Sequence, residues 1–176
     1  KVAAEQITVR LPAKNRAEKV TMEIKDLNAL YPQKKAELKK ASRSFSAVIL
    51  TGPRRAGKTT LLRKLFPEAE YYLLEDPDVI SRLRADPRSF LEEVHCPAIL
   101  DEIQHVPELL GYVRTRIDRS PDKKGLWFLT GSQEAPLMRG VTESLAGRAA
   151  LFNLLPLSQQ ETPKVSLLKG GFPEVL

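Results

Sequence analysis

The sequence predicts an α/β fold in which a mostly parallel, five-stranded sheet is covered by helices on both faces. Short apolar runs alternate with segments of helical periodicity along most of the chain. Strands separated by helix-sized segments need crossover connections, and such connections produce parallel sheets. Runs such as Val48–Leu50 also lack polar alternation, which is typical of strands buried on both faces. Together these observations predict three layers, with the sheet in the middle.

The first half of this predicted domain contains two strands. Ala47–Leu50 ends at a glycine-rich turn, and the leucines of Thr60–Phe66 then recur at helical spacing. Tyr71–Leu74 is the second strand and ends in an acidic stretch. Asp78–Val94 has helical periodicity that is interrupted near Pro87, because proline removes a helical hydrogen bond.

The second half contains three further strands. Ala98–Leu100 is a short apolar run, and Glu108–Arg119 is predicted to be a helix. Pro107 lies near the first turn of that helix, where proline is tolerated. Leu126–Leu129 is the fourth strand and Leu151–Leu155 the fifth.

Residues 1–46 differ from the remainder in charge. They contain 11 Lys/Arg and 5 Asp/Glu, whereas the remaining 130 residues contain 17 of each, so the net charge of +6 arises in the first segment. Gln6–Leu11 and Lys19–Lys25 alternate apolar and polar residues and predict a hairpin, and Gln33–Ala41 predicts a lysine-rich helix. Such a basic segment either forms a solvated surface or attracts phosphates. Nucleic-acid binding therefore stays an open alternative. We divide the chain into this lead segment and a domain over residues 47–176.

Composition excludes several classes of protein. Hydrophobic residues make up 42% of the chain and charged residues 28%, as in soluble globular proteins. No apolar run approaches the roughly 20 residues that cross a bilayer, so we expect no membrane contact. The single cysteine, Cys96, cannot form an internal disulfide, which favours the cytoplasm, and we expect it to be a small buried side chain beside a strand.

Residues 52–59 match a phosphate-binding loop. Gly52-Pro53-Arg54-Arg55-Ala56-Gly57-Lys58-Thr59 fits the pattern G-x-x-x-x-G-K-[ST], with a predicted strand before it and a helix after it. The two glycines let successive N–H groups converge on a phosphate that a side chain would obstruct. Lys58 would reach the β- and γ-phosphates, and the Thr59 hydroxyl would bind Mg²⁺. We therefore predict ATP and Mg²⁺ as ligands of residues 52–59 and Thr60, while Arg54 and Arg55 contact nucleotide or face solvent.

Two adjacent carboxylates follow the third strand. Neighbouring side chains at a strand end point in different directions, so Asp101 and Glu102 can have different roles. We predict that Asp101 holds Mg²⁺ and that Glu102 activates the attacking water. The alternative is a surface acidic pair that caps the next element. Tyr71–Leu74 intervenes between the loop strand and the acidic strand, which by analogy of fold favours the class that hydrolyses ATP over the kinases.

Two further groups are candidates for the same site. The fourth strand ends in Thr130 and Ser132, and either hydroxyl would contact the γ-phosphate or the attacking water, or cap a turn. Arg148 would stabilise the transition state, in cis or across a subunit boundary, or else fix a loop to a carboxylate. His95 and His105 lack partners at metal-ligand spacing and are predicted to make local contacts, and Trp127 is predicted to lie in the sheet core.

Five stretches taken together resemble a known family. They are Gly-Pro-Arg-Arg-Ala-Gly-Lys-Thr-Thr-Leu-Leu, Leu-Asp-Glu-Ile-Gln-His-Val-Pro, Leu-Thr-Gly-Ser, Ser-Leu-Ala-Gly-Arg and Gly-Gly-Phe-Pro-Glu. The chain resembles, over about residues 48–176, prokaryotic AAA-like P-loop ATPases with a C-terminal, nuclease-like domain. The resemblance implies the additional-strand topology, Asp101 on Mg²⁺, Glu102 as catalytic acid-base residue and Arg148 in a functional region. The family continues beyond the last stretch, so we expect the domain to be truncated before its C-terminal partner.

Three functions are consistent with these residues. The first is an ATP-hydrolysing motor or switch for an effector domain, with self-association as an added expectation. The second is a nucleotide-gated regulator with little turnover, and the third is a P-loop kinase. A weaker resemblance to transporter ATPases suggests Tyr31 as an adenine-stacking residue.

Overall fold

The central sheet has five parallel strands, in the order β4-β5-β6-β3-β7. The computed structural model describes residues 6–8, 21–23, 32–132, 140–141 and 143–156, with side chains from Lys34 onward. The strands are β3 (Ala47–Thr51), β4 (Glu70–Leu73), β5 (Ala98–Asp101), β6 (Trp127–Gly131) and β7 (Ala149–Asn153). The helices are α2 (Pro32–Ser44), α3 (Lys58–Leu65), α4 (Pro77–Ala85), α5 (Pro87–Glu93), the 3-10 turn η1 (Ile103–His105) and α6 (Leu109–Asp118).

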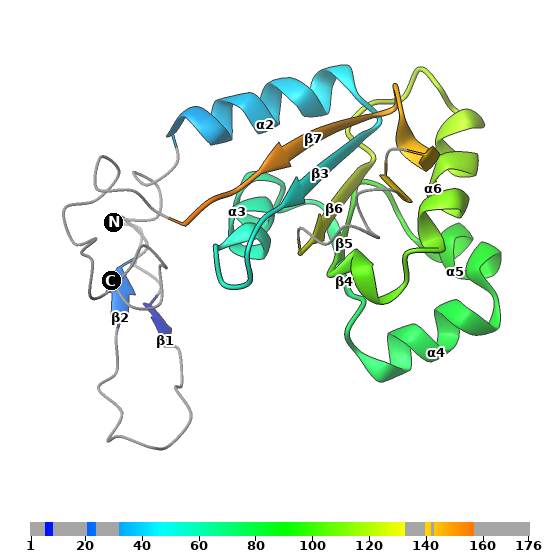
Figure 1. Cartoon of the computed structure of the whole chain (residues 1–176), viewed down its shortest axis with the longest axis horizontal. Coiled ribbons are helices and arrows are strands. Elements are labelled where there is room, and N and C mark those ends of the chain that lie inside the picture. The colour runs from blue at the N-terminus through cyan, green and yellow to red at the C-terminus, as the bar shows by residue number, and fades with distance from the viewer. Residues whose placement is uncertain (1–5, 9–20, 24–31, 133–139, 142, 157–176) are drawn as a thin grey trace.

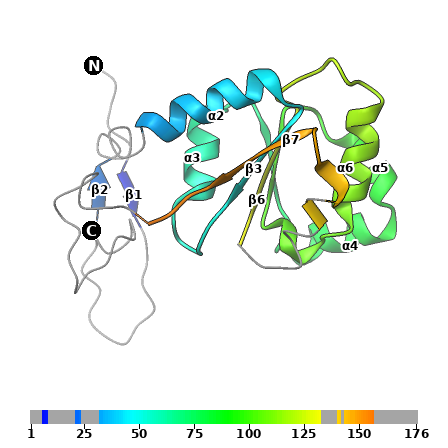
Figure 2. The ribbon, with the colours of Figure 1, turned by 45° about the horizontal axis from the view of Figure 1, so that its top comes forward.

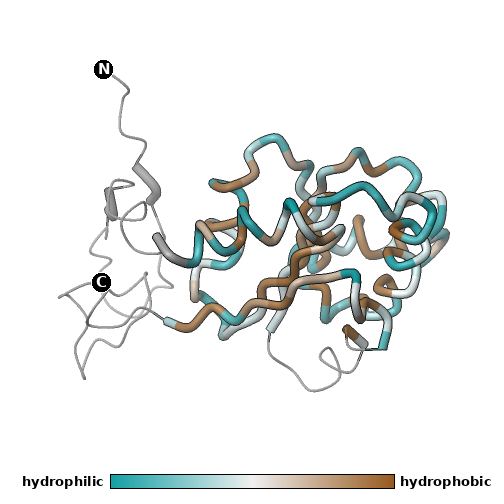
Figure 3. Tube along the Cα trace, turned by 90° about the horizontal axis from the view of Figure 1, so that it is seen from above, coloured by the Kyte–Doolittle hydropathy of each residue, from teal (hydrophilic) through white to brown (hydrophobic). Residues whose placement is uncertain are grey.

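Helices cover the sheet on both faces, as predicted. Alternate strand residues enter two separate cores, because successive side chains of a strand point to opposite faces. Ile49, Leu100 and Leu129 pack under α4, α5 and α6. Their neighbours Val48, Ile99 and Phe128 pack under α2 and α3. The two helical layers are seen on either side of the strands in Figures 1 and 2. Figure 3 shows brown, apolar segments along the central strands.

The order of the strands corrects one part of the prediction. The strand that lies between the loop strand β3 and the acidic strand β5 is β6, whereas β4 is at the edge of the sheet. The additional-strand arrangement is therefore present, but Trp127–Gly131 provides the inserted strand and the predicted Tyr71–Leu74 does not. Trp127 is 1% exposed and lies in the core, as expected.

Most boundaries shift slightly from those predicted, and two of the differences have a clear local reason. The single helix expected over residues 78–94 is two helices, because Asp86 ends α4 and its carboxylate accepts hydrogen bonds from the backbone N–H groups of Arg88 and Ser89 at the start of α5. β7 begins at Ala149, two residues before the predicted strand. Ala149 pairs with Ala47, so β7 starts level with β3.

The described residues of the lead segment include a part of each expected hairpin strand. β1 (Gln6–Thr8) pairs with β2 (Thr21–Glu23) in an antiparallel, two-stranded sheet. Cys96 is exposed, which corrects the prediction of a buried side chain. The reason is its position: it precedes the first residue of β5 and therefore lies outside the sheet core. Tyr31 and the stretch after Pro156 lie outside the described residues.

Candidate functional site

The phosphate loop connects the carboxyl end of β3 to the first turn of α3. Gly57 precedes the helix with φ 90°, in the region that favours glycine. Gly52 has φ 146°, and a Cβ atom built there would lie 2.1 Å from the backbone oxygen of Leu154. The sequence suggested that a side chain at Gly52 would obstruct the phosphate. In the structure, a side chain at Gly52 would instead clash with the backbone that follows β7.

Lys58 is the buried cation of this loop. It is 4% exposed, and its Nζ donates hydrogen bonds to the backbone oxygens of Gly52 (3.1 Å) and Pro53 (2.9 Å). Burial lowers the pKa of Lys58, and the nearby charges of Glu102 and Asp101 oppose that shift. The amine therefore lies inside the curl of the loop, at the N-terminus of α3, where an anion is favoured.

Asp101 accepts hydrogen bonds from three hydroxyl groups. The Thr59 hydroxyl lies 3.0 Å from Oδ1 and 2.9 Å from Oδ2, and the Tyr71 hydroxyl donates to Oδ2 at 2.7 Å. The Thr130 hydroxyl donates to Oδ1. Asp101 is only 3% exposed, so these donors satisfy a charge that is largely removed from solvent. They come from α3, β4 and β6, and they join the phosphate loop to the acidic strand.

Glu102 turns away from the strand that ends at Asp101. Its φ of 61° is in the left-handed region, so the chain bends immediately after β5. Its N–H donates to the Thr130 hydroxyl at 3.0 Å. Its carboxylate accepts a hydrogen bond from the Gln104 amide, whose oxygen accepts from the N–H of Ser132 at 3.2 Å. The two carboxylates thus have different surroundings, as predicted for different roles.

The Thr130 hydroxyl has a different contact from the one expected. It donates to Asp101 and accepts from the N–H of Glu102, so it holds the acidic pair together. A contact of Thr130 with a phosphate or the attacking water stays a prediction. Thr130 is completely buried, in agreement with this role. Ser132 reaches the pair through its backbone and Gln104.

Tyr71 and Gln104 were not among the predicted site residues. Burial and the hydrogen bond to Asp101 raise the pKa of Tyr71, so its hydroxyl remains a donor. The signal for Gln104 was its position two residues after Glu102 in the quoted Asp-Glu-Ile-Gln stretch. Tyr71 gave a weaker signal, because its approach to Asp101 depends on β4 lying beside β5.

Arg148 lies at the amino edge of the sheet, where the parallel strands begin. Its backbone oxygen accepts from the N–H of Ala47, at the start of β3, whereas the phosphate loop follows the end of that strand. Five strand residues separate the two positions, about 16 Å at roughly 3.3 Å per residue. The guanidinium instead binds Asp118, with Nε to Oδ1 at 2.5 Å and Nη2 to Oδ2 at 3.1 Å. Within one chain, Arg148 therefore fixes a loop to a carboxylate, which corrects the cis catalytic prediction.

The remaining charged candidates make local contacts. Arg54 is mostly exposed and lies 4.0 Å from Glu75. Arg55 is exposed and has φ 65°, so the loop bends there too. His95 Nδ1 lies 3.1 Å from Glu70. Within the described ranges, no group of three or more His, Cys, Asp or Glu side chains is arranged to hold a metal ion.

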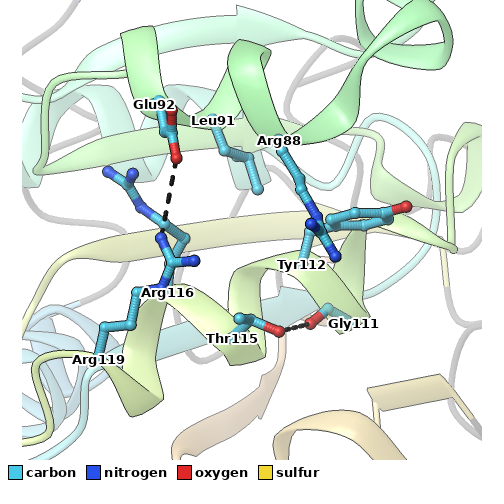
Figure 4. A pocket seen from close by; sticks show the side chains of 8 residues that line it. All are labelled: Arg88, Leu91, Glu92, Gly111, Tyr112, Thr115, Arg116 and Arg119. Atoms are coloured by element: carbon cyan, nitrogen blue, oxygen red, sulfur yellow. Dashed lines mark hydrogen bonds and ion pairs between the residues drawn. The ribbon is translucent and has the colours of Figure 1, made fainter.

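A pocket of about 340 Å³ lies between α5 and α6, apart from the predicted site residues (Figure 4). Three arginines line it, and one of them, Arg119, approaches Glu92 at 3.8 Å. The other lining residues are Arg88, Leu91, Gly111, Tyr112, Thr115 and Arg116. None of them belongs to the phosphate loop or to the acidic pair.

The residues at the carboxyl edge fit a magnesium ion. Mg²⁺ prefers oxygen ligands and binds proteins through one or two carboxylates, together with phosphates and water. Thr59 and Asp101 bring a hydroxyl and a carboxylate within 3.0 Å of each other beside the buried Lys58. That both residues hold the metal stays a prediction.

The fold and this site define the chain as a P-loop ATPase-like domain with an additional-strand sheet. A family model described as an AAA domain matches residues 44–162, so the chain belongs to the AAA domain family.

Several known proteins are similar to this chain. The uncharacterized proteins Rv2008c of Mycobacterium tuberculosis and Mb2031c of Mycobacterium bovis are each 36% identical to it over 145 residues, which is 78% of this chain and 32% of each relative. The chain thus spans about a third of the length of these curated relatives. Among solved structures, the Walker-type ATPase PABY2304 of Pyrococcus abyssi has a TM-score of 0.52 and 19% identity, covering 75% of this chain and 55% of that one. This last similarity shows the fold alone.

Of the helices that the structure describes, none combines the length and the apolar character that crossing a bilayer needs.

Proposed function

We propose that this domain binds ATP with Mg²⁺ at the carboxyl edge of its sheet and hydrolyses it. The observation that supports this most strongly is the contact between Thr59 and both carboxylate oxygens of Asp101, at 3.0 and 2.9 Å. It brings the phosphate loop and the acidic strand to a single point. A phosphate loop alone supports binding, whereas a loop joined to an acidic pair supports hydrolysis.

Lys58 and Thr59 provide the binding half of the proposed site. The Lys58 amine donates to two backbone oxygens, and the phosphate oxygens of ATP are stronger acceptors for a buried ammonium group. Thr59 and Asp101 would hold Mg²⁺, which neutralises charge on the β- and γ-phosphates when it is bound.

Glu102 provides the catalytic half. Its carboxylate belongs to a residue that bends out of β5, so it is separated from the Asp101 carboxylate that the three hydroxyls hold. In the proposed reaction Glu102 orients the attacking water and accepts its proton as the water oxygen bonds to the γ-phosphorus and the bond to ADP breaks.

Gln104 favours a second candidate function, a nucleotide-gated regulator with little turnover. Its amide binds the Glu102 carboxylate, and its oxygen is tied to the backbone of Ser132. While that contact persists, Glu102 has a partner other than water. Turnover would then depend on a change in the chain after β6, which suits a switch.

We also propose that the ATPase serves a further part of a longer protein, as a motor or a switch. The basis is that the chain spans only 32% of its curated relatives, together with the resemblance to AAA-like ATPases that have a C-terminal, nuclease-like domain. Self-association and nucleic-acid binding by the basic residues 1–46 belong to the same proposal.

The test is phosphate release from ATP by the purified chain, compared with Lys58→Ala and Glu102→Gln. We expect Glu102→Gln to bind ATP as well as the parent chain does while hydrolysing it about 100-fold more slowly, since general bases contribute on that scale. Lys58→Ala should lose nucleotide binding itself.

Other outcomes select other functions. Parent turnover no higher than that of Glu102→Gln, with nucleotide still bound, would contradict the hydrolase and favour the regulator. ATP consumption that requires an added phosphate acceptor would indicate a kinase.

A further inference from the structure

Strand β4 presents two consecutive tyrosines to opposite faces of the sheet. Tyr71 packs against the core under α2 and α3, and Tyr72 packs against the core under α4, α5 and α6. The Tyr72 hydroxyl donates to Glu70 at 2.8 Å, and the Tyr72 and Phe90 rings pack edge to face with their centres 5.4 Å apart. Tyr71 instead reaches the candidate site. The two neighbours are chemically identical, so any difference between them comes from their partners.

The sheet places Tyr71 within reach of Asp101. Tyr71 is paired with Ile99 on β5, and Asp101 is two residues further along that strand. Such a diagonal neighbour lies on the same face and within reach of an aromatic side chain. The Tyr71 hydroxyl spans this gap and donates to Asp101 Oδ2 at 2.7 Å.

Helix α3 contacts the ring of the same tyrosine. The Arg63 guanidinium lies 4.8 Å from the centre of the Tyr71 ring, in a cation–π arrangement. Arg63 is four residues after Thr59, so both side chains are on one face of α3. The helix that supplies Thr59 to Asp101 therefore also fixes the ring whose hydroxyl binds Asp101.

The three hydroxyls are not equivalent in what they fix. Thr59 has one proton and lies at similar distances from both oxygens of Asp101, so it does not select between them. Thr130 donates to Oδ1 and Tyr71 donates to Oδ2. Only the last two together define the rotation of the carboxylate plane.

We infer that Tyr71 is a positioning residue for the metal-binding carboxylate. It acts through Asp101, whose orientation it fixes. This inference rests on the proposed function, because it assumes that Asp101 holds Mg²⁺ beside ATP. Second-sphere partners of metal ligands typically change metal affinity about 10–100-fold when they are removed.

The experiment measures binding of the methylene analogue of ATP by calorimetry, once with Mg²⁺ and once with EDTA. Tyr71→Phe removes one oxygen and retains the ring under Arg63. We expect it to bind the analogue as the parent does in EDTA, and about tenfold more weakly than the parent in Mg²⁺. The matched control is Tyr72→Phe, which should equal the parent in both conditions. Thermal melting without nucleotide or metal verifies that both variants are folded.

The outcomes separate this inference from the function on which it rests. If Tyr71→Phe gains as much affinity from Mg²⁺ as the parent, or loses affinity equally in EDTA, the positioning role is wrong and the proposed site is unaffected. If the parent gains nothing from Mg²⁺, the proposed magnesium–nucleotide site itself is wrong.

Discussion

The carboxyl edge of the sheet, where the parallel strands end, and the amino edge, where they begin, differ in the surroundings of their charged residues. At the carboxyl edge, Asp101 is 3% exposed and accepts from three hydroxyls, while Lys58 is buried beside it. At the amino edge, Arg148 and Asp118 form an ion pair whose side chains are 32% and 44% exposed. Buried, fully partnered charges are costly to build and depend on every partner, whereas exposed pairs contribute little. The comparison supports the proposal that the chemistry occurs at the carboxyl edge and that the ion pair at the amino edge is structural.

The position of Arg148 at the amino edge could have been predicted from the sequence. In a parallel sheet all strands start at one edge and end at the other, and ligands bind beyond the carboxyl ends. Arg148 precedes the fifth strand even with the predicted boundary at Leu151. It therefore belongs to the amino edge, and only a partner molecule would bring it to a nucleotide. The number of residues between Arg148 and the earlier motifs does not indicate this position. Its place directly before the fifth strand does.

The largest expected effect on stability is that of a substitution at Gly52, where the phosphate loop approaches the chain after β7. Gly52→Ala would place Cβ 2.1 Å from the Leu154 oxygen, in a backbone region that disfavours side chains. We expect a loss of about 3 kcal/mol in the free energy of unfolding, measured by urea denaturation.

Gly111→Ala is the matched control for this change. Gly111 lies in α6, and a Cβ atom added there would meet no atom of the described residues within 4 Å. Alanine at this position should therefore stabilise the helix by about 0.5–1 kcal/mol. Equal losses at both glycines would contradict the close approach of the chain after β7 to the loop.

A smaller effect is expected from Thr130→Val, which keeps the shape of the side chain and removes its hydroxyl. Asp101 then loses a donor and the Glu102 N–H loses an acceptor, at a cost of about 2 kcal/mol in stability. Phosphate release should fall as well, because the Asp101 carboxylate and the backbone of Glu102 each lose a contact.

Thr51→Val provides the comparison for Thr130. Thr51 is also buried at the end of a strand, but its hydroxyl donates to the backbone oxygen of Phe152 and not to a carboxylate of the site. We expect the change to lower stability without lowering the turnover of ATP. Loss of turnover in both variants would mean that the two hydroxyls affect turnover only by stabilising the fold, which would contradict a specific role for Thr130.

The smallest effect is expected at the amino edge and depends on pH. The hydrogen bond from Arg148 holds the pKa of Asp118 below its usual range. A depressed carboxyl pKa stabilises the folded state above the unfolded value, about 3.9, and the contribution is lost as the pH falls through the folded value. The melting temperature of Asp118→Asn should thus be slightly below that of the parent at pH 7 and should converge with it below about pH 4. A difference that is unchanged by acid would contradict the ion pair as its cause.

Motifs in the sequence were sufficient for the parts of the site that are local in the chain. Residues 52–59 and the Asp101–Glu102 pair were predicted because strand, loop and helix follow one another directly. The alternation of strand residues places Asp101 on the face of Ile99 and Thr130 on the face of Phe128, and in the structure both of these faces pack under α2 and α3. Local pattern does not give the order of strands in the sheet. For that reason the inserted strand was assigned to Tyr71–Leu74 instead of β6, and the contact between Tyr71 and Asp101 was missed.

The most direct test of the account compares ATP turnover by the parent, Glu102→Gln and Arg148→Ala at equal protein concentration. The account predicts that Glu102→Gln loses about 100-fold in phosphate release, and that Arg148→Ala stays within about twofold of the parent. Retained turnover in Glu102→Gln, together with lost turnover in Arg148→Ala, would contradict the assignment of the chemistry to the carboxyl edge of one chain.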